Sequence, residues 1–221
     1  MPETISLVPG PEERALFLGQ NGSGKSLGAL SLLIPIIGKK PIYIFDTKGE
    51  QHFDKLTRQL GENVASMHDR FRDVAKAETP VIIYRPDGRE MADLDFIDRT
   101  NQWVYDRRNC LVLYDEVSQV TGGQVNPKPG FLNVYTRGRS RGIAVWANSQ
   151  RPAYVPKVVY TEARRFYVYF LADVNDRKKV SGFTHPGLMT TPTRKYGFMY
   201  FAPGMANPLE FGPMRLRKEV A

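Results

Sequence analysis

The chain has 221 residues, of which 42% are hydrophobic and 24% charged, with a formal net charge of +8 and one cysteine. This length and composition fit one globular α/β domain with a sizeable core, and a lone cysteine excludes the disulfide frameworks of small secreted proteins. The longest apolar region, Leu27 to Ile37, contains glycine and proline and is too short to cross a bilayer. Because the N-terminus also lacks a basic-then-apolar signal, we expect a cytoplasmic protein, not secreted and with no transmembrane segment.

The net charge is unevenly distributed along the chain. Residues 1–110 contain 15 Lys+Arg and 16 Asp+Glu, whereas residues 111–221 contain 16 and 7. A net charge of −1 in the first half and +9 in the second favours a polyanionic partner that contacts the C-terminal half. The alternative is a basic surface with no such partner, and composition alone does not decide between them.

Short apolar runs alternate with longer helical patterns, which predicts a single domain with a mostly parallel sheet flanked by helices. The predicted strands are Ala15–Leu18, Ile42–Phe45, Val81–Tyr84, Leu111–Tyr114, Ile143–Ala147 and Phe166–Phe170. The predicted helices are Lys25–Leu33, Gln51–Leu60, Leu94–Tyr105, Leu132–Arg137 and a short one near Asp173–Val180. Residues 181–221 are expected to form a C-terminal extension, in which Tyr196–Phe201 adds an edge strand or hairpin.

The first strand leads into a loop with the spacing Gly-x-x-x-x-Gly-Lys-Ser, which is the phosphate-binding P-loop pattern. Its glycines allow backbone N–H groups to turn toward an anion, and the following helix directs the positive end of its dipole at the same point. Lys25 is expected to reach the outer phosphates and the Ser26 hydroxyl to bind Mg²⁺. The predicted nucleotide-binding residues of this loop are Gly19, Gln20, Asn21, Gly22, Ser23, Gly24, Lys25, Ser26 and Leu27.

A second motif is the apolar run Cys110–Leu113 followed by Tyr114, Asp115 and Glu116, which has the arrangement of a Walker B strand. Asp115 is expected to hold Mg²⁺ through its water shell, and Glu116 to orient and deprotonate the attacking water. The alternative is that both acidic residues cap the following turn. A glutamate directly after the aspartate favours hydrolysis by water over transfer to another substrate.

A third motif follows the second predicted strand, where Asp46-Thr-Lys48-Gly-Glu50 stands. The carboxyl ends of parallel strands meet where ligands bind, so Asp46 and Lys48 are expected at the same edge as the P-loop. We count Asp46 among the candidate nucleotide-binding residues. The alternative is an N-cap and first-turn acid for the next helix.

A fourth motif surrounds the strand Ile143–Ala147. Asn148 and Gln150 follow it and are candidates for contacting the γ-phosphate or the attacking water. Arg139 and Arg141 precede it, toward the edge opposite the chain's own P-loop, and are better placed to reach the nucleotide of an adjacent subunit. DNA-phosphate contacts and simple solvated charge are the alternatives for these arginines.

These motifs in this order resemble the FtsK/HerA superfamily of RecA-like motor ATPases, over about residues 13–170. Because we expect no membrane anchor, extra helical domain or DNA-reading C-terminal module, the chain is most similar to the genome-packaging ATPases of tailless, membrane-containing double-stranded DNA viruses. The resemblance implies a RecA-like (ASCE) P-loop fold, ATP and Mg²⁺ as cofactors, and a homo-oligomeric ring of five or six subunits in the host cytoplasm or at a virion vertex. It also implies a γ-phosphate sensor at Gln150 and an arginine finger at Arg139 or Arg141. Thr47 departs from the proline that the family often has there.

The partner implied by this resemblance is double-stranded DNA, contacted through phosphates and without sequence preference. A viral portal or capsid vertex protein is a further expected partner. The candidate DNA contacts are Lys128, in the predicted loop Val120–Gly130, and the basic turn Arg177, Lys178 and Lys179. The alternatives to a packaging motor are a filamentous-phage assembly ATPase and a nucleotide-gated binding protein that does no translocation; a small-molecule kinase is the weakest candidate.

Overall fold

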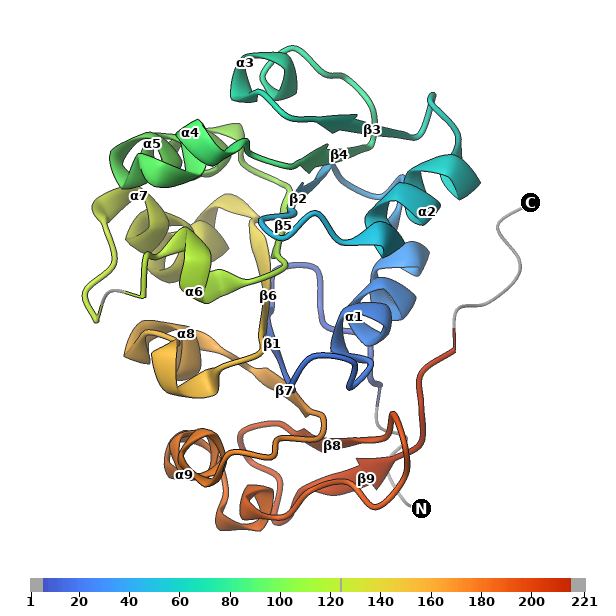
Figure 1. The fold of residues 1–221 in the computed structure, drawn as a ribbon, viewed down its shortest axis with the longest axis vertical. Helices are drawn as coiled ribbons and strands as arrows, with labels where there is room; N and C mark the ends of the chain where they lie inside the picture. The colour runs from blue at the N-terminus through green and yellow to red at the C-terminus, as the bar shows by residue number, and fades with distance from the viewer. Residues whose placement is uncertain (1–5, 124, 216–221) are drawn as a thin grey trace.

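In the computed structural model, which describes residues 6–123 and 125–215, nine strands form one sheet in the order β3-β4-β2-β5-β6-β1-β7-β8-β9 (Figure 1). The strands are β1 (Arg14–Leu18), β2 (Ile42–Phe45), β3 (Ala65–His68), β4 (Val81–Tyr84), β5 (Leu111–Tyr114), β6 (Ala144–Ser149), β7 (Arg165–Val168), β8 (Phe198–Phe201) and β9 (Leu209–Phe211). All neighbouring pairs from β3 to β7 are parallel, and β8 and β9 are antiparallel additions. The predicted α/β class with a mostly parallel sheet is confirmed.

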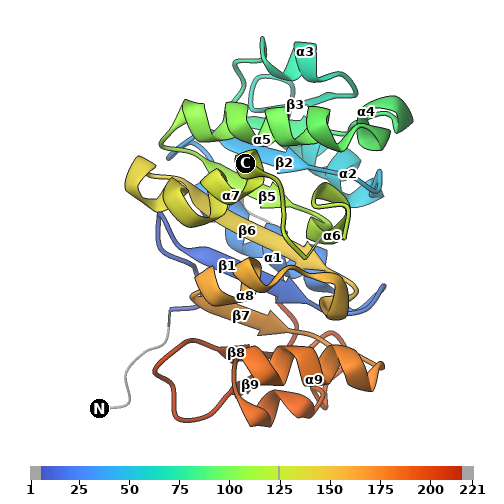
Figure 2. The ribbon, with the colours of Figure 1, turned by 90° about the vertical axis from the view of Figure 1, so that its left-hand side faces the viewer.

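Helices cover both faces of the sheet (Figures 1 and 2). One face carries α1 (Lys25–Leu33) and α2 (Gln51–Leu60). The other face carries α5 (Leu94–Arg107), α6 (Val117–Val120), α7 (Pro129–Leu132), α8 (Lys157–Glu162) and α9 (Val174–Phe183). Helix α4 (Gly88–Ala92) lies beside α5, and α3 (Phe71–Val74) lies near β3. Shorter helical turns are Ile34–Ile36, the π-turn Asn133–Arg137, Gly138–Arg141, Pro152–Tyr154 and Pro186–Met189.

The two covered faces explain why the central strands are largely apolar, apart from Arg14 at the start of β1 and Asn148 and Ser149 at the end of β6. Along β1, Leu16 and Leu18 belong to the core beneath α5 to α9, whereas Ala15 and Phe17 belong to the core beneath α1 and α2. Successive side chains of a strand point to opposite faces, so a strand covered on both sides buries both sets of side chains. Phe17 stacks on Tyr167 of β7 with ring centroids 4.4 Å apart.

The six predicted strands are present, with small changes at their ends. The change that matters most is at β6, which runs to Ser149 and so includes Asn148. Sequence patterning missed β3, because Ala-Ser-Met-His contains one fully buried residue and lies at the edge of the sheet. It also missed the short helices α3, α4, α6, α7 and α8, of which α7 begins at Pro129, inside the predicted loop Val120–Gly130. The predicted helix Leu132–Arg137 is mostly a π-turn.

The C-terminal extension starts within α9 and includes the antiparallel hairpin β8–β9, which occupies the predicted Tyr196–Phe201 segment and beyond. Residues 216–221 of the extension and Gln124 of the predicted loop Val120–Gly130 lie outside the described residues. In the part of the chain that the structure describes, no helix combines the length and apolarity needed to cross a membrane.

Gly28 and Gly182 offer a matched test of this packing. A Cβ on Gly28 would lie 1.8 Å from the Tyr169 hydroxyl oxygen, whereas a Cβ on Gly182, in α9, has nothing within 4 Å. Gly28→Ala should therefore destabilise the protein by about 1–3 kcal/mol through overpacking. Gly182→Ala should stabilise it by up to about 1 kcal/mol, because alanine is the better helix former. Thermal unfolding of both variants checks this, and an equal shift in the same direction would contradict it.

Candidate nucleotide-binding and hydrolysis site

The candidate site lies where four parallel strands end side by side. In the register of the sheet Leu18 of β1 pairs with Ser149 of β6, and Phe45 of β2 pairs with Tyr114 of β5. Strand β6 lies between β1 and β5, so the P-loop, the Asp115-Glu116 pair and the end of β6 meet at one edge. The segments are fastened together by backbone hydrogen bonds, including Gly19 N–H to the Ser149 carbonyl at 3.1 Å.

The P-loop has the backbone that an anion cradle requires. Gly22 and Gly24 have φ angles of +72° and +96°, a region that side chains disfavour, and α1 begins directly at Lys25. Gly19 is required for space, because a Cβ there would lie 2.5 Å from Ser23 Oγ and 2.6 Å from Tyr169 Cβ. These backbone angles at the start of a helix are what the P-loop pattern in the sequence predicts.

Lys25 is buried in the centre of the site and its side chain is 4% exposed. Burial, and after it the neighbouring Lys48 ammonium, lower the pKa of Lys25 below its usual range. With the Gln150 amide turned so that its oxygen faces the two lysines, that oxygen accepts from Lys25 Nζ at 3.2 Å and from Lys48 Nζ at 2.9 Å. Two lysine ammonium groups therefore lie around one amide oxygen, an arrangement that fits the binding of a polyphosphate.

Asp115 lies within reach of the P-loop serine. Its Oδ1 accepts from Ser26 Oγ at 3.2 Å and from Asn148 Nδ2 at 2.9 Å, and its side chain is almost fully buried. Burial raises the pKa of Asp115, although the hydrogen bond from Asn148 opposes the change. A buried carboxylate next to a hydroxyl is a site that a divalent cation would stabilise. Within the described residues the Oδ1 of Asn148 is buried without a hydrogen-bond partner, which leaves one more oxygen free there.

Glu116 is held by four donors. Lys48 Nζ donates to its Oε2 at 2.6 Å, and the backbone N–H of Gln150 donates to the same oxygen at 3.0 Å. The hydroxyls of Ser149 and Ser118 donate to Oε1 at 2.7 and 2.8 Å. Burial alone would raise the pKa of Glu116, but Lys48 and these hydrogen bonds outweigh it and lower the pKa. The carboxylate is therefore ionised and fixed in orientation.

Asp46 lies at the predicted edge and is fully buried, but both of its oxygens are already engaged within the chain. Its Oδ1 accepts from the backbone N–H of Glu50 at 3.1 Å, and its Oδ2 from Arg85 Nε at 2.7 Å. Arg85 also bonds Asp54 on α2 at 3.2 Å. In this structure Asp46 thus fixes the loop that carries Lys48; its contact with a nucleotide stays a prediction.

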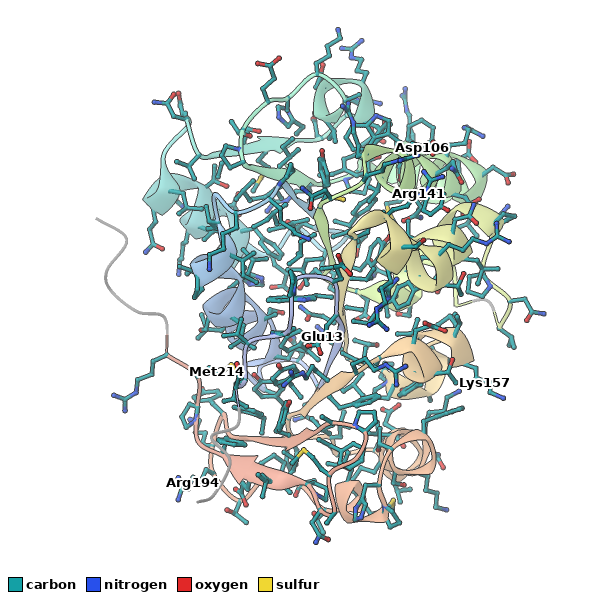
Figure 3. The ribbon with its side chains drawn as sticks, turned by 180° about the vertical axis from the view of Figure 1, so that it is seen from behind. Glu13, Asp106, Arg141, Lys157, Arg194 and Met214 are labelled. Atoms are coloured by element: carbon teal, nitrogen blue, oxygen red, sulfur yellow. The ribbon has the colours of Figure 1, made fainter. Side chains whose placement is uncertain are left out.

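Arg139 and Arg141 lie at the opposite edge of the sheet, as their place before β6 predicts. Arg139 is exposed and lines a hollow of about 620 Å³ together with Arg14, Arg164 and Glu162. Arg141 is engaged by α5, with its guanidinium 3.9 Å from the centroid of the Tyr105 ring and 3.6 Å from Asp106 (Figure 3). Arg139 is therefore the freer of the two candidates.

The side chains predicted to contact DNA differ in how many contacts they already make within the chain. Lys128, the N-cap of α7, pairs with Asp95 of α5. Arg177 and its neighbours belong to α9, not to a turn, because Asp173 caps this helix. Arg177 donates to the Leu171 carbonyl at 2.8 Å, and Lys179 lies 5.6 Å from the Phe183 ring centroid. Lys178 is exposed.

The sequence analysis did not predict a role for three residues around the site. Lys48 was expected at this edge without a role, and it is the partner of Glu116. Arg85 follows β4 directly, so the rule that strand ends meet at the ligand edge could have found it. Ser149 could have been found in the same way had β6 been extended by two residues.

Comparison with known proteins gives consistent results. The protein-family model described as zonular occludens toxin (Zot) matches residues 15–181. The DNA packaging ATPase P9 of Enterobacteria phage PRD1 is 26% identical over 219 residues, covering 94% of this chain and 89% of P9. This similarity confirms the predicted resemblance to viral genome-packaging ATPases.

Solved structures share the fold at low sequence identity. The genome-packaging NTPase B204 of Sulfolobus turreted icosahedral virus 2, in complex with ATP-γ-S, superposes with a TM-score of 0.73 at 16% identity, covering 94% of this chain and all of B204. VirB4 of Thermoanaerobacter pseudethanolicus superposes with a TM-score of 0.68 at 9% identity, covering 93% of this chain and 90% of VirB4.

Replacing each of the two neighbouring carboxylates by an amide should change the thermal stability of the protein in opposite directions. Without nucleotide or Mg²⁺, Asp115→Asn should raise the melting temperature, because it removes a buried charge whose pKa burial raises. Glu116→Gln should lower the melting temperature, with a loss of about 1–3 kcal/mol in the free energy of unfolding, because it removes the charge that Lys48 and three other donors stabilise. Thermal unfolding at pH 7 in EDTA checks both signs.

The decrease in melting temperature caused by Glu116→Gln should also depend on pH. The pKa of Glu116 in the folded state is lower than its ordinary value of 4.5. The ionised carboxylate therefore makes its full contribution to the free energy of unfolding above pH 4.5, and that contribution is lost as the pH falls through the folded-state pKa. The difference in melting temperature from the unmutated protein should therefore shrink below about pH 4.5. A deficit that stays constant down to pH 3 would contradict the ionised, paired state of Glu116.

Proposed function

Because the chain belongs to the zonular occludens toxin (Zot) family, and because of the geometry of its site, we propose that it is an ATP-hydrolysing motor that translocates double-stranded DNA and packages a viral genome. The observation that carries this proposal is the meeting of Lys25, Glu116 and Gln150 at one strand edge. The P-loop supplies a phosphate cradle, and Glu116 supplies a fixed, ionised carboxylate beside it. The name of PRD1 P9, a DNA packaging ATPase, supports the same activity.

In this proposal the P-loop and Lys25 bind the phosphates of ATP, and Ser26 and Asp115 hold Mg²⁺. The bound ion would neutralise charge on the phosphates. The other steps belong to side chains of the chain itself. Glu116 orients the attacking water and accepts its proton, becoming neutral as it does so. Its lowered pKa means that the carboxylate is already ionised at neutral pH before the water attacks. Gln150 contacts the γ-phosphate from the place where it now bonds Lys25 and Lys48.

We further propose that the active form is a ring in which one subunit completes the site of the next. Arg139 lies at the amino edge of the sheet and its own P-loop at the carboxyl edge, so it reaches a nucleotide only on another subunit. A cation placed against the transferring phosphoryl group stabilises the charge that develops there. Five or six subunits, and a portal or capsid vertex protein as a partner, remain expectations from the family resemblance.

The proposed load is double-stranded DNA, because the C-terminal half carries the excess of positive charge. Lys178 is the best-placed of the predicted contacts in this structure because it is exposed, whereas Lys128 is paired with Asp95.

We expect ATP hydrolysis to be stimulated by double-stranded DNA of any sequence, with the stimulation lost as salt is raised from 50 to 200 mM, because phosphate contacts release counterions. Lys25→Ala should abolish hydrolysis with and without DNA. Phosphate release measured over a salt series checks both, with Lys157→Ala as the control, since Lys157 is an exposed residue of α8 on the face of the sheet opposite α1. Hydrolysis that ignores DNA at every salt concentration would instead favour a nucleotide-gated binding protein.

Subunit mixing tests the shared site. Arg139→Ala and Lys25→Ala chains are each expected to be inactive alone, and mixed rings should regain activity because one subunit offers an intact P-loop and the other an intact arginine. An Arg141→Ala chain should keep most of its own activity, because Arg141 is engaged by Tyr105 and Asp106. The trans assignment of Arg139 fails if the mixture never exceeds the activity of its components.

A further inference from the structure

Beside the P-loop lies a hollow that extends past the phosphate-binding residues. It has a volume of about 310 Å³, within the range of about 300–1,000 Å³ typical of small-molecule sites. One wall is the P-loop and the start of α1, up to Leu27. The opposite wall consists of Glu50, His52, Tyr196, Pro213 and Met214.

Tyr196 is presented to this hollow by a strained turn. Its φ angle is +60°, which is rare for an aromatic residue, and its side chain is nevertheless 49% exposed. The turn is fixed from β9, since Glu210 Oε1 accepts from the backbone N–H and the hydroxyl of Thr193 at 2.8 and 2.7 Å. Strain of this kind persists only where the surrounding structure imposes it, and it gathers at ligand sites.

The ring stands directly against the phosphate cradle. A Cβ built on Gly24 would lie 3.5 Å from the Tyr196 Cβ and 3.6 Å from its Cδ1. The same side chain also lines a second hollow with Gln20 and Gly22. Tyr196 therefore borders the P-loop on the outside, where the rest of a nucleotide must leave the cradle.

The other part of the wall comes from the chain after β9, which returns along α1 (Figures 1 and 3). A Cβ on Gly28 would lie 3.6 Å from Met214 Sδ, which puts the thioether beside the first turn of α1. His52 adds a polar edge, because its Nε2 is buried without a hydrogen-bond partner in the described part of the chain. An aromatic ring, a thioether and an unpaired ring nitrogen together suit a flat heteroaromatic group.

We propose that Tyr196 and Met214 bind the purine base of the nucleotide, with Tyr196 as its stacking surface. The inference rests on the proposed function, since it takes the phosphates to lie in the P-loop. From there the ribose passes Leu27 and the base enters the hollow. Tyr196 and Met214 both lie beyond residue 181, the end of the family match, so the C-terminal extension supplies the base site of the motor.

The test compares ligands with and without a base. In titration calorimetry with Mg²⁺, Tyr196→Ala should weaken binding of AMPPNP about tenfold, since a base loses its stacking partner. Its affinity for inorganic tripolyphosphate should be unchanged. Tyr196→Phe should bind both as the unmutated protein does, and Tyr154→Ala, at another exposed tyrosine, is the matched control.

Tyr196→Asn guards against a folding artefact, because asparagine tolerates a positive φ and also removes the ring. It should behave like Tyr196→Ala, with unchanged circular dichroism. Unchanged AMPPNP binding in both variants, or equal weakening of AMPPNP and tripolyphosphate, would overturn the base site and leave the proposed motor function standing. If the unmutated protein binds neither ligand, the proposed function fails and the base site with it.

Discussion

The structure depends on one constraint, the placement of β6 between β1 and β5 in a parallel sheet. Strands β1, β5 and β6 end at the same edge, and Leu18 is directly opposite Ser149. The P-loop, the two carboxylates and Gln150 come from segments about 90 and 35 residues apart in the chain, and only this strand order brings them within hydrogen-bond distance. The strands that carry this edge are buried, because helices cover both faces of the sheet.

The surroundings at this edge of the sheet shift the pKa values of two neighbouring carboxyl groups in opposite directions. Asp115 and Glu116 are both buried, yet burial raises the pKa of the first while Lys48, Ser149 and the Gln150 N–H lower that of the second. Neighbouring carboxylates with opposite shifts divide naturally into a cation-binding group and an ionised base. Lys25 and Lys48 share the Gln150 oxygen, so the positive charge that a polyphosphate needs is already assembled.

Much of this was predictable from the sequence, because local patterns determine it. Gly19 to Ser26 specify a P-loop by their backbone requirements, and the four apolar residues before Tyr114 and Asp115 specify a buried strand. The sequence could not give Arg85 as the partner of Asp46, because that contact joins the ends of β4 and β2 and depends on strand order. Edge strand β3 was missed because its short sequence is half polar. The wall formed by Tyr196 and Met214 depends on the turn before β8 and on the return of the chain after β9 to α1, and no local pattern encodes such a return.

The most direct test is single-turnover hydrolysis of bound ATP by Glu116→Gln and by the unmutated chain, followed by rapid quenching. The variant keeps the P-loop, Lys25 and Asp115, so it should bind ATP as tightly as the unmutated chain. It should leave that ATP intact, with cleavage slowed by at least about 100-fold, because the base is gone. Cleavage at the unmutated rate would contradict the assignment of this strand edge as a hydrolysis site.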